Sequence, residues 1–129
     1  IGTATTLAGL IKNNGNNIEI IGIPVLKGLF DIENRIKYLL KSDSFIPPTI
    51  FHDYHFGGYA KFDNVLIQKM NEFYLQHKIP TDFVYTGKMI FALFDLIKNN
   101  YFKRGSKIIA VHTGGIQGNQ SLPSETLVF

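Results

Sequence analysis

The sequence has no cysteine and no tryptophan among its 129 residues. Without cysteine the chain forms no disulfide and offers no thiolate to a metal or to a nucleophilic mechanism, a composition that fits a reducing compartment. Long apolar runs are also missing, and none approaches the ~20 residues that a membrane helix needs. Lys12 follows the first apolar stretch instead of preceding it, unlike a signal peptide. We therefore expect a cytoplasmic protein with no membrane partner.

Charge and common catalytic motifs give further exclusions. The net charge is only +3, and lysines occur on every predicted helix, which is typical of solvated faces and predicts no nucleic-acid partner. The chain has no Gly-x-Ser-x-Gly elbow, no Walker A lysine motif and no Gly-x-Gly-x-x-Gly fingerprint. His52 and His55 have His-x-x-His spacing beside Asp53, but no further ligand is near in sequence, so we predict no metal site.

Strand-like and helix-like segments alternate along the chain. The strand-like segments are β-branched or apolar and cover 18–23, 49–54, 83–85 and 107–112, the last being the clearest buried strand. Helices are predicted over 6–12, from Asp31 to Leu40, from an Asp63 cap, and over 87–99, the last with an inner face at Ile90, Leu93, Phe94 and Ile97. This alternation predicts one α/β domain: a mainly parallel sheet with helices on both faces.

The first residues have the pattern of a phosphate-binding loop. Gly2 and the small and hydroxyl residues up to Thr6 lead directly into a helix, whose free N–H groups and dipole favour an anion. The alternative is an ordinary helix N-terminus capped by Thr5 or Thr6. Such a loop normally follows a buried strand, and only Ile1 precedes it. We therefore expect the chain to be part of a larger protein.

Two further turns fall where strands of the predicted sheet end, at 85–87 and 112–115. Ligands bind beyond the carboxyl ends of such strands, so all three turns should converge. Tyr85 is a candidate acid–base or stacking residue, and Thr86 and Thr113 are candidate ligand contacts. The alternatives are a buried tyrosine, a threonine N-cap and a structural His112.

Lys88 lies in the first turn of the last predicted helix, where its charge opposes the helix dipole. We interpret it as a solvated lysine, although this unfavourable position hints at a partner.

Several of these segments, taken in order, resemble one enzyme family. The matching stretches are Val84–Met89, Asp95–Ile97 and Gly105–Gly115, together with Phe56–Tyr59 and the opening loop. They resemble the 1-aminocyclopropane-1-carboxylate deaminase and D-cysteine desulfhydrase family, which are pyridoxal-phosphate enzymes of the tryptophan-synthase-β fold type. The resemblance spans nearly the whole chain and implies part of the large domain of such an enzyme.

The resemblance implies a role for each matching position. Tyr59 and Tyr85 would face substrate and cofactor, with Tyr85 the better candidate for proton transfer. Thr86 and Thr113 would lie near the cofactor's ring nitrogen, with Gly114 beside them. The phosphate would be held by Gly2, Thr3, Ala4, Thr5 and Thr6.

Two departures qualify the implied activity. In this family, deaminases proper have a glutamate where this chain has Thr86 and typically a leucine where it has Thr113. These two threonines favour β-elimination from D-cysteine over deaminase activity. No lysine in the chain matches the family's Schiff-base lysine, so we expect residues 1–129 to be a carboxy-terminal portion, inactive alone, of a homodimeric enzyme acting on a small amino acid. We also expect exposed apolar surface and weak stability. The alternatives are a non-catalytic phosphate-ligand-binding or regulatory module, and a flavodoxin-like phosphate binder.

Overall fold

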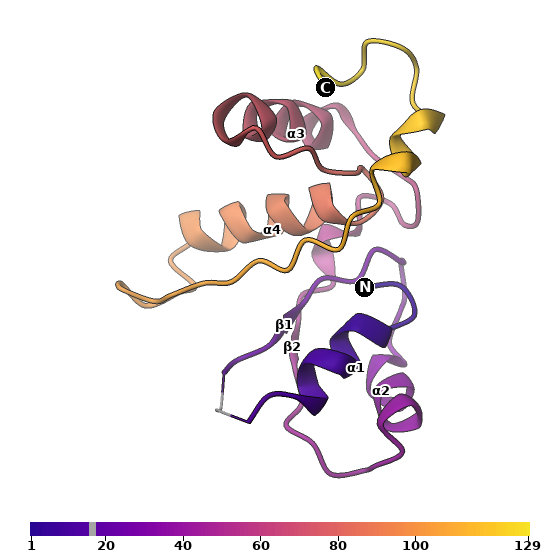
Figure 1. Cartoon of the computed structure of the whole chain (residues 1–129), viewed down its shortest axis with the longest axis vertical. Coiled ribbons are helices and arrows are strands. Elements are labelled where there is room, and N and C mark those ends of the chain that lie inside the picture. The colour runs from indigo at the N-terminus through magenta and orange to yellow at the C-terminus, as the bar shows by residue number, and fades with distance from the viewer. Residues whose placement is uncertain (16–17) are drawn as a thin grey trace.

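The computed structural model describes residues 1–15 and 18–129, and it contains short strands between helices (Figure 1). The elements in order are α1 (Thr5–Lys12), β1 (Ile21–Gly22), α2 (Ile32–Leu40), β2 (Thr49–Ile50), the 3-10 turn η1 (Asp53–His55), α3 (Asn64–His77), α4 (Thr86–Lys98) and the 3-10 turn η2 (Ile116–Ser121).

The sheet within the described residues is parallel, as predicted. Strand β1 pairs with β2 in the register Ile21 to Thr49. Ile1 lies on the other side of β1, because its terminal ammonium donates to the Ile23 carbonyl and its carbonyl accepts from the Val25 amide. The opening loop therefore leaves from the edge of the parallel pair, and this positions the N-terminus of α1.

Two apolar cores stabilise the fold. One lies between α1 and α2, where helical spacing places Leu7, Ile11, Ile32 and Ile36 on facing sides. The other joins α3 to the residues before α4 and includes Leu66, Met70, Phe83 and Val84. In Figure 1, α1 and α2 lie at one end of the molecule and α3 and α4 at the other.

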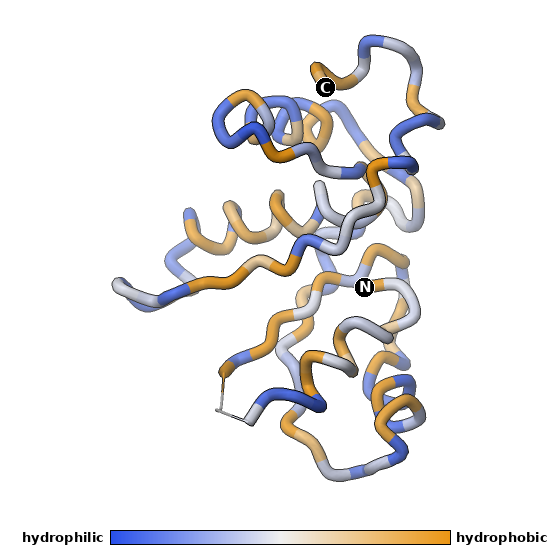
Figure 2. The backbone as a smooth tube through the Cα atoms, in the orientation of Figure 1, coloured by the Kyte–Doolittle hydropathy of each residue, from blue (hydrophilic) through white to orange (hydrophobic). Residues whose placement is uncertain are grey.

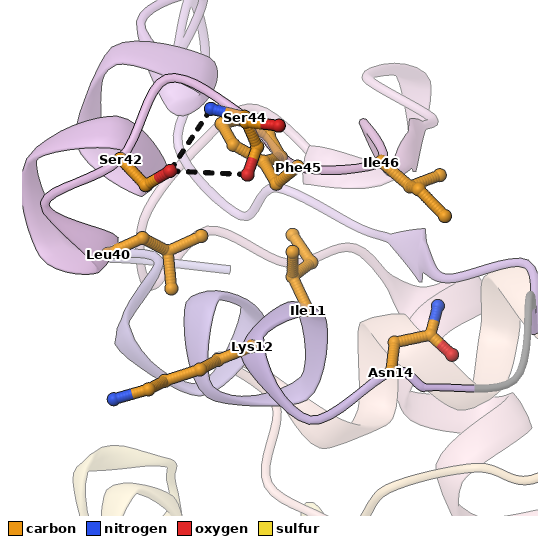
Figure 3. A pocket seen from close by; sticks show the side chains of 8 residues that line it. All are labelled: Ile11, Lys12, Asn14, Leu40, Ser42, Ser44, Phe45 and Ile46. Atoms are coloured by element: carbon orange, nitrogen blue, oxygen red, sulfur yellow. Dashed lines mark hydrogen bonds between the residues drawn. The ribbon is translucent and has the colours of Figure 1, made fainter.

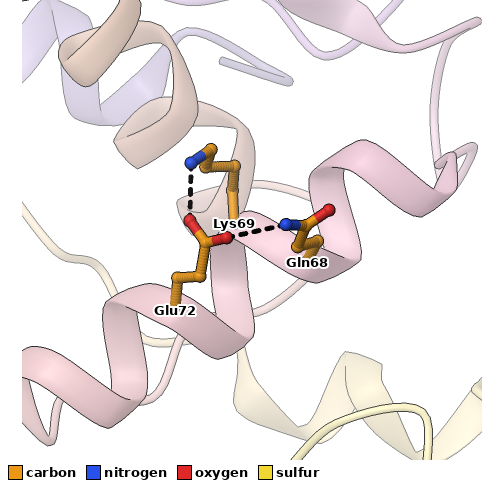
Figure 4. Close-up of polar contacts among 3 residues, drawn as sticks. All are labelled: Gln68, Lys69 and Glu72. Carbon is orange, nitrogen blue, oxygen red and sulfur yellow. Dashed lines mark hydrogen bonds and ion pairs between the residues drawn. The ribbon is translucent and has the colours of Figure 1, made fainter.

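Helix α3 has the cap that the sequence predicts. The Asp63 carboxylate accepts a hydrogen bond from the Leu66 amide at 2.8 Å. On its outer side Glu72 accepts from both Lys69 and Gln68, which lowers the pKa of that carboxyl (Figure 4). These side chains are exposed, so the group adds little to the free energy of unfolding.

The predicted strands were partly wrong. Strands β1 and β2 contain only two residues each of 18–23 and 49–54. Residues 83–85 form a turn held by hydrogen bonds to Asp82. Residues 107–112 run as an extended apolar segment, visible as a mostly orange stretch in Figure 2, but all of them are exposed. No strand pairs with this segment within the described residues, so it lacks the burial that its apolar character predicts.

The predicted inner face of α4 was also partly wrong. Ile90 is buried, but Phe94 and Ile97 are exposed, and Ala92 and Leu96 are buried in their place. The exposed apolar surface that we expected is therefore present, on α4 and on residues 107–112. No helix among the described residues is long and apolar enough to cross a membrane.

Candidate functional site

The N-terminus of α1 lacks a capping side chain. Ala4 is the N-cap, with a left-handed backbone (φ 68°, ψ 6°), and no side chain accepts from the first turn. The alternative of a threonine cap was therefore wrong. Within the described residues no group accepts from the amides of Thr5, Thr6 and Leu7, which leaves these donors available to an anion.

Hydroxyl groups flank these free amides. The Thr3 and Thr5 hydroxyl oxygens lie 3.0 Å apart and share a hydrogen bond, and both side chains are exposed. Because either hydroxyl can turn toward a ligand, the opening loop offers both backbone and side-chain donors. This donor set suits the oxygens of a phosphate.

Tyr85 packs directly against the opening loop. A Cβ atom built on Gly2 would lie 3.1 Å from the Tyr85 hydroxyl oxygen and 3.4 Å from its ring. Glycine at position 2 therefore allows the tyrosine to approach the loop closely. The Tyr59 ring packs edge-on against Tyr85, with centroids 6.0 Å apart. The structure thus brings together Gly2, Tyr59 and Tyr85, which lie far apart in sequence.

The tyrosine pair is partly open to solvent, with Tyr59 56% and Tyr85 36% exposed. Burial raises the pKa of Tyr85, and the neighbouring Tyr59 raises it further. Tyr85 therefore keeps its proton at neutral pH and can donate it.

Asp82 fixes the backbone around Tyr85, and the sequence analysis missed it. Its carboxylate is fully buried and accepts from the amides of Val84, Tyr85 and Thr86 at 2.7–2.9 Å. A signal was available in the sequence, because aspartate carboxylates in turns commonly accept hydrogen bonds from backbone amides a few residues further on. Gly115 covers the same carboxylate, since a Cβ there would lie 3.0 Å from Asp82 Oδ2.

Thr86 is bound to this carboxylate. Its hydroxyl donates to Asp82 Oδ2 at 2.6 Å and accepts from the Asp82 amide at 2.8 Å. The residue is 2% exposed. One lone pair remains on this oxygen, so any further polar partner of Thr86 has to be a hydrogen-bond donor.

The turn at 112–115 lies against the residues before α4. His112 Nδ1 accepts from the Gly114 amide at 3.2 Å, so Nε2 carries the proton and donates to the Pro80 carbonyl at 3.0 Å. His112 therefore has the structural role given as its alternative. Thr113 is exposed, and Gly114 has a left-handed backbone (φ 84°).

The interpretation of Lys88 as a solvated lysine was wrong. Lys88 is fully buried, and its Nζ donates to the carbonyl oxygens of His55 and Gly58, each at 2.8 Å. Burial lowers the pKa of this ammonium to about 8, while the negative charge of Asp82 acts in the opposite direction. Its position in the first helical turn, unfavourable for a cation, was the signal of this partner.

Other candidate regions do not meet this site. An open hollow of about 320 Å³ lies at the far end of α1, between Ile11 and Phe45, with Ser42 and Ser44 on its rim (Figure 3). Within residues 1–15 and 18–129, no three acidic, histidine or cysteine side chains are grouped closely enough to hold a metal ion.

Comparison with known proteins identifies similar chains. No protein-family model matches the sequence. A Pyrococcus horikoshii protein named as a candidate 1-aminocyclopropane-1-carboxylate deaminase is 34% identical over 91% of this chain and 38% of its own length. A Pyrococcus furiosus protein of the same name is 35% identical over 99% of this chain and 41% of its own length. A D-cysteine desulfhydrase of Serratia proteamaculans is 25% identical over 88% of this chain.

A solved structure shows the same fold. The crystal structure of an ACC deaminase homologue superposes with a TM-score of 0.78 and 32% sequence identity, over 92% of this chain and 39% of its own. These matches confirm the predicted resemblance to the carboxy-terminal portion of 1-aminocyclopropane-1-carboxylate deaminase and D-cysteine desulfhydrase relatives, and they confirm the α/β class. The chain spans about 40% of the length of these relatives.

Proposed function

We propose that the protein containing this chain is a pyridoxal-phosphate-dependent deaminase or desulfhydrase acting on a small amino acid. D-cysteine, cleaved to an α-keto acid, ammonia and sulfide, is the favoured substrate, and 1-aminocyclopropane-1-carboxylate is the other candidate. The observation that carries this proposal is the packing of Tyr85 against Gly2 and of Tyr59 against Tyr85, beside the uncapped N-terminus of α1. The names of similar proteins support the same chemistry.

The opening loop fits the phosphate end of the cofactor. The amides of Thr5 and Thr6 have no acceptor within the described residues, and the hydroxyls of Thr3 and Thr5 are exposed. We assign the phosphate to Gly2, Thr3, Ala4, Thr5 and Thr6 because free amides, hydroxyls and the helix dipole all favour an anion at this position. The left-handed Ala4 ends the loop and begins the helix.

The tyrosine pair fits the reacting end of the substrate. When bound, pyridoxal phosphate withdraws electrons from the substrate's α-carbon. The Tyr85 hydroxyl is protonated at neutral pH and lies beside the opening loop, so it can donate to a leaving group or to a carbon that becomes negatively charged. Tyr59 packs edge-on against that ring and limits its rotation. We assign proton donation to Tyr85 and substrate orientation to Tyr59.

Thr113, Gly114 and Thr86 are the proposed contacts of the cofactor ring. The Thr113 hydroxyl is exposed, and the glycine beside it allows close approach. The Thr86 oxygen is already a donor to Asp82, so toward a ring nitrogen it would accept from a protonated nitrogen. The buried negative charge of Asp82 behind it would favour that protonated form. No carboxylate reaches the ring in this assignment, consistent with elimination rather than ring opening.

The test uses the longest natural polypeptide that contains this sequence, loaded with pyridoxal phosphate. Keto acid and sulfide from D-cysteine are measured beside keto acid from 1-aminocyclopropane-1-carboxylate. Tyr85→Phe should lower kcat by about 10² or more, because the proton donor is removed. Tyr38→Phe is the matched control, since Tyr38 is 84% exposed on α2. No product from either substrate, or equal kcat in the two variants, would contradict the proposal.

A further inference from the structure

Lys88 joins two segments that carry the two tyrosines. It lies in the first turn of α4, three residues after Tyr85. Its buried Nζ donates hydrogen bonds to the carbonyls of His55 and Gly58. Those carbonyls are at the two ends of one short loop, and Tyr59 follows it directly. A buried ammonium costs free energy unless hydrogen bonds replace its water. Among the described residues, both hydrogen-bond acceptors of Lys88 belong to the loop of residues 55–58, which directly precedes Tyr59.

The loop has a backbone conformation that L-residues rarely adopt. Phe56, Gly57 and Gly58 have φ values of 54°, 90° and 127° in succession. Left-handed backbone is unfavourable for a bulky residue such as phenylalanine, so the loop needs outside contacts to hold it. These three residues bend the backbone so that the carbonyls of His55 and Gly58 both bond to the Nζ atom of Lys88.

Other contacts fasten the start of this loop to the same face of α4. The Phe56 and Phe91 rings meet at right angles, with centroids 4.9 Å apart. The Tyr54 hydroxyl donates to Asp95 at 2.7 Å. Positions 88, 91 and 95 share one helical face, so α4 receives the loop along a single stripe. Lys88 is the member of this stripe that bonds to Gly58, the residue next to Tyr59.

We propose that Lys88 is a positioning residue that fastens residues 55–58 to α4 and thereby sets the Tyr59 ring against Tyr85. Each of these carbonyls also accepts from a nearby backbone amide, Gly58 to His55 and Lys61 to Gly58. The cation adds a second, charge-assisted hydrogen bond to each, and these two bonds join the loop to α4. Lys88 touches neither substrate nor cofactor in this role. Its effect on turnover rests on the proposed function, but the fastening of the loop does not.

The first test compares Lys88→Met with Lys98→Met in the cofactor-loaded natural polypeptide. Lys98 is an exposed lysine at the end of the same helix, so it controls for loss of charge and for helix propensity. We expect amide hydrogen exchange of residues 55–61 to rise about tenfold or more in Lys88→Met, the size expected from losing hydrogen bonds to a charge. Exchange in α1 should stay unchanged. Unchanged exchange at 55–61 would overturn the proposal.

A second variant loosens the loop from the other side. Gly58→Ala forces a side chain into a backbone with φ 127°, where the new Cβ makes only an ordinary 3.7 Å contact. Gly105→Ala is the matched control, because Gly105 also has positive φ (85°) and no atom near its Cβ position. If Lys88 acts through this loop, the double variant Lys88→Met with Gly58→Ala should have a kcat little lower than that of either single variant. Additive losses would overturn the proposal.

Steady-state kinetics separate positioning from general stability. Lys88→Met and Gly58→Ala should each lower kcat by about tenfold with KM changed by less than about twofold, because a misplaced tyrosine affects the reacting step more than binding. Equal losses in all four variants would overturn the positioning role. If the unmodified protein has no activity on either substrate, the proposed function fails, and the exchange measurement still decides whether Lys88 holds the loop.

Discussion

At Gly87 the structure predicts a substantial loss in the free energy of unfolding when a single methyl group is added. A Cβ built there would lie 2.8 Å from the Asp82 carbonyl oxygen, and 2.7 Å and 2.9 Å from Met70 Sδ and Cγ. The methionine can move, but the carbonyl is backbone, and it accepts the Gly87 amide in the turn that starts α4. Gly87→Ala therefore has to shift the N-terminus of α4, which carries Tyr85.

The magnitude follows from two opposing terms. Overpacking against rigid atoms costs about 3 kcal/mol, the upper part of its usual range, and alanine in a helix gains about 1 kcal/mol over glycine. The net loss is then about 2 kcal/mol in the free energy of unfolding. Gly9→Ala in α1 is the matched control, because no atom lies within 4 Å of its Cβ position. It should gain about 0.5–1 kcal/mol.

The assay is urea unfolding of the natural polypeptide and both variants, followed by far-UV circular dichroism. We expect the midpoint to fall for Gly87→Ala and to rise slightly for Gly9→Ala. Tyrosine near-UV signals should change in Gly87→Ala, because the shift moves Tyr85. If Gly87→Ala is as stable as Gly9→Ala, then Met70 and the Asp82 carbonyl do not pack tightly against the start of α4, and the reasoning is refuted.

Three other predictions concern the pKa of Lys88, the hydrogen bonds of Asp82 and the reactivity of the chain's lysines toward pyridoxal phosphate. The ¹³Cε signal of Lys88 should titrate near pH 8, because burial lowers its folded pKa below the ordinary 10.5. Between about pH 8 and 10.5 the unfolded chain binds the extra proton, so this group makes the free energy of unfolding rise with pH, and Lys88→Met should lose that rise. A Lys88 midpoint at 10.5 would contradict its burial. Asp82→Asn replaces a carboxylate oxygen that accepts the Thr86 hydroxyl, and it should lower the free energy of unfolding in urea by about 1–3 kcal/mol. The exposed Asp43→Asn is the control and should change it by about zero. Equal stability of the two variants would refute the role of Asp82 in holding the turn before α4. Pyridoxal phosphate and borohydride should label no lysine stoichiometrically in the 129-residue chain, and mass spectrometry showing one labelled lysine would refute this.

Local sequence patterns correctly predicted those parts of the fold that depend on interactions between residues close together in the chain. The apolar spacing around Ile32 and Ile36 and the Asp63 cap identified α2 and the start of α3, because helical periodicity and capping act within a few residues. Strand lengths depend on partners elsewhere in the chain. Residues 107–112 have the composition of a buried strand, yet they have no paired strand within the described residues, so composition alone overestimated their burial.

The candidate site was predictable in part. The turns at Gly2 and Tyr85 were recognised from their residues and Tyr59 from the family resemblance, and the structure brings these three residues together. Asp82 and Lys88 were not recognised, because their roles depend on buried partners. Lys88 bonds to carbonyls 33 and 30 residues away in the chain, and no pattern in its neighbouring residues indicates such distant partners. Only its unfavourable position at a helix N-terminus distinguished it.

Mapping of backbone amides tests the central claim most directly, namely that the α1 N-terminus holds a phosphate next to Tyr85. The ¹⁵N-labelled natural polypeptide is titrated with pyridoxal phosphate and, in parallel, with pyridoxal. We expect the amides of Thr5, Thr6 and Leu7 to shift only with the phosphorylated compound, because they lack acceptors within the described residues. Phosphate-dependent shifts elsewhere, with these three amides unmoved, would contradict the account.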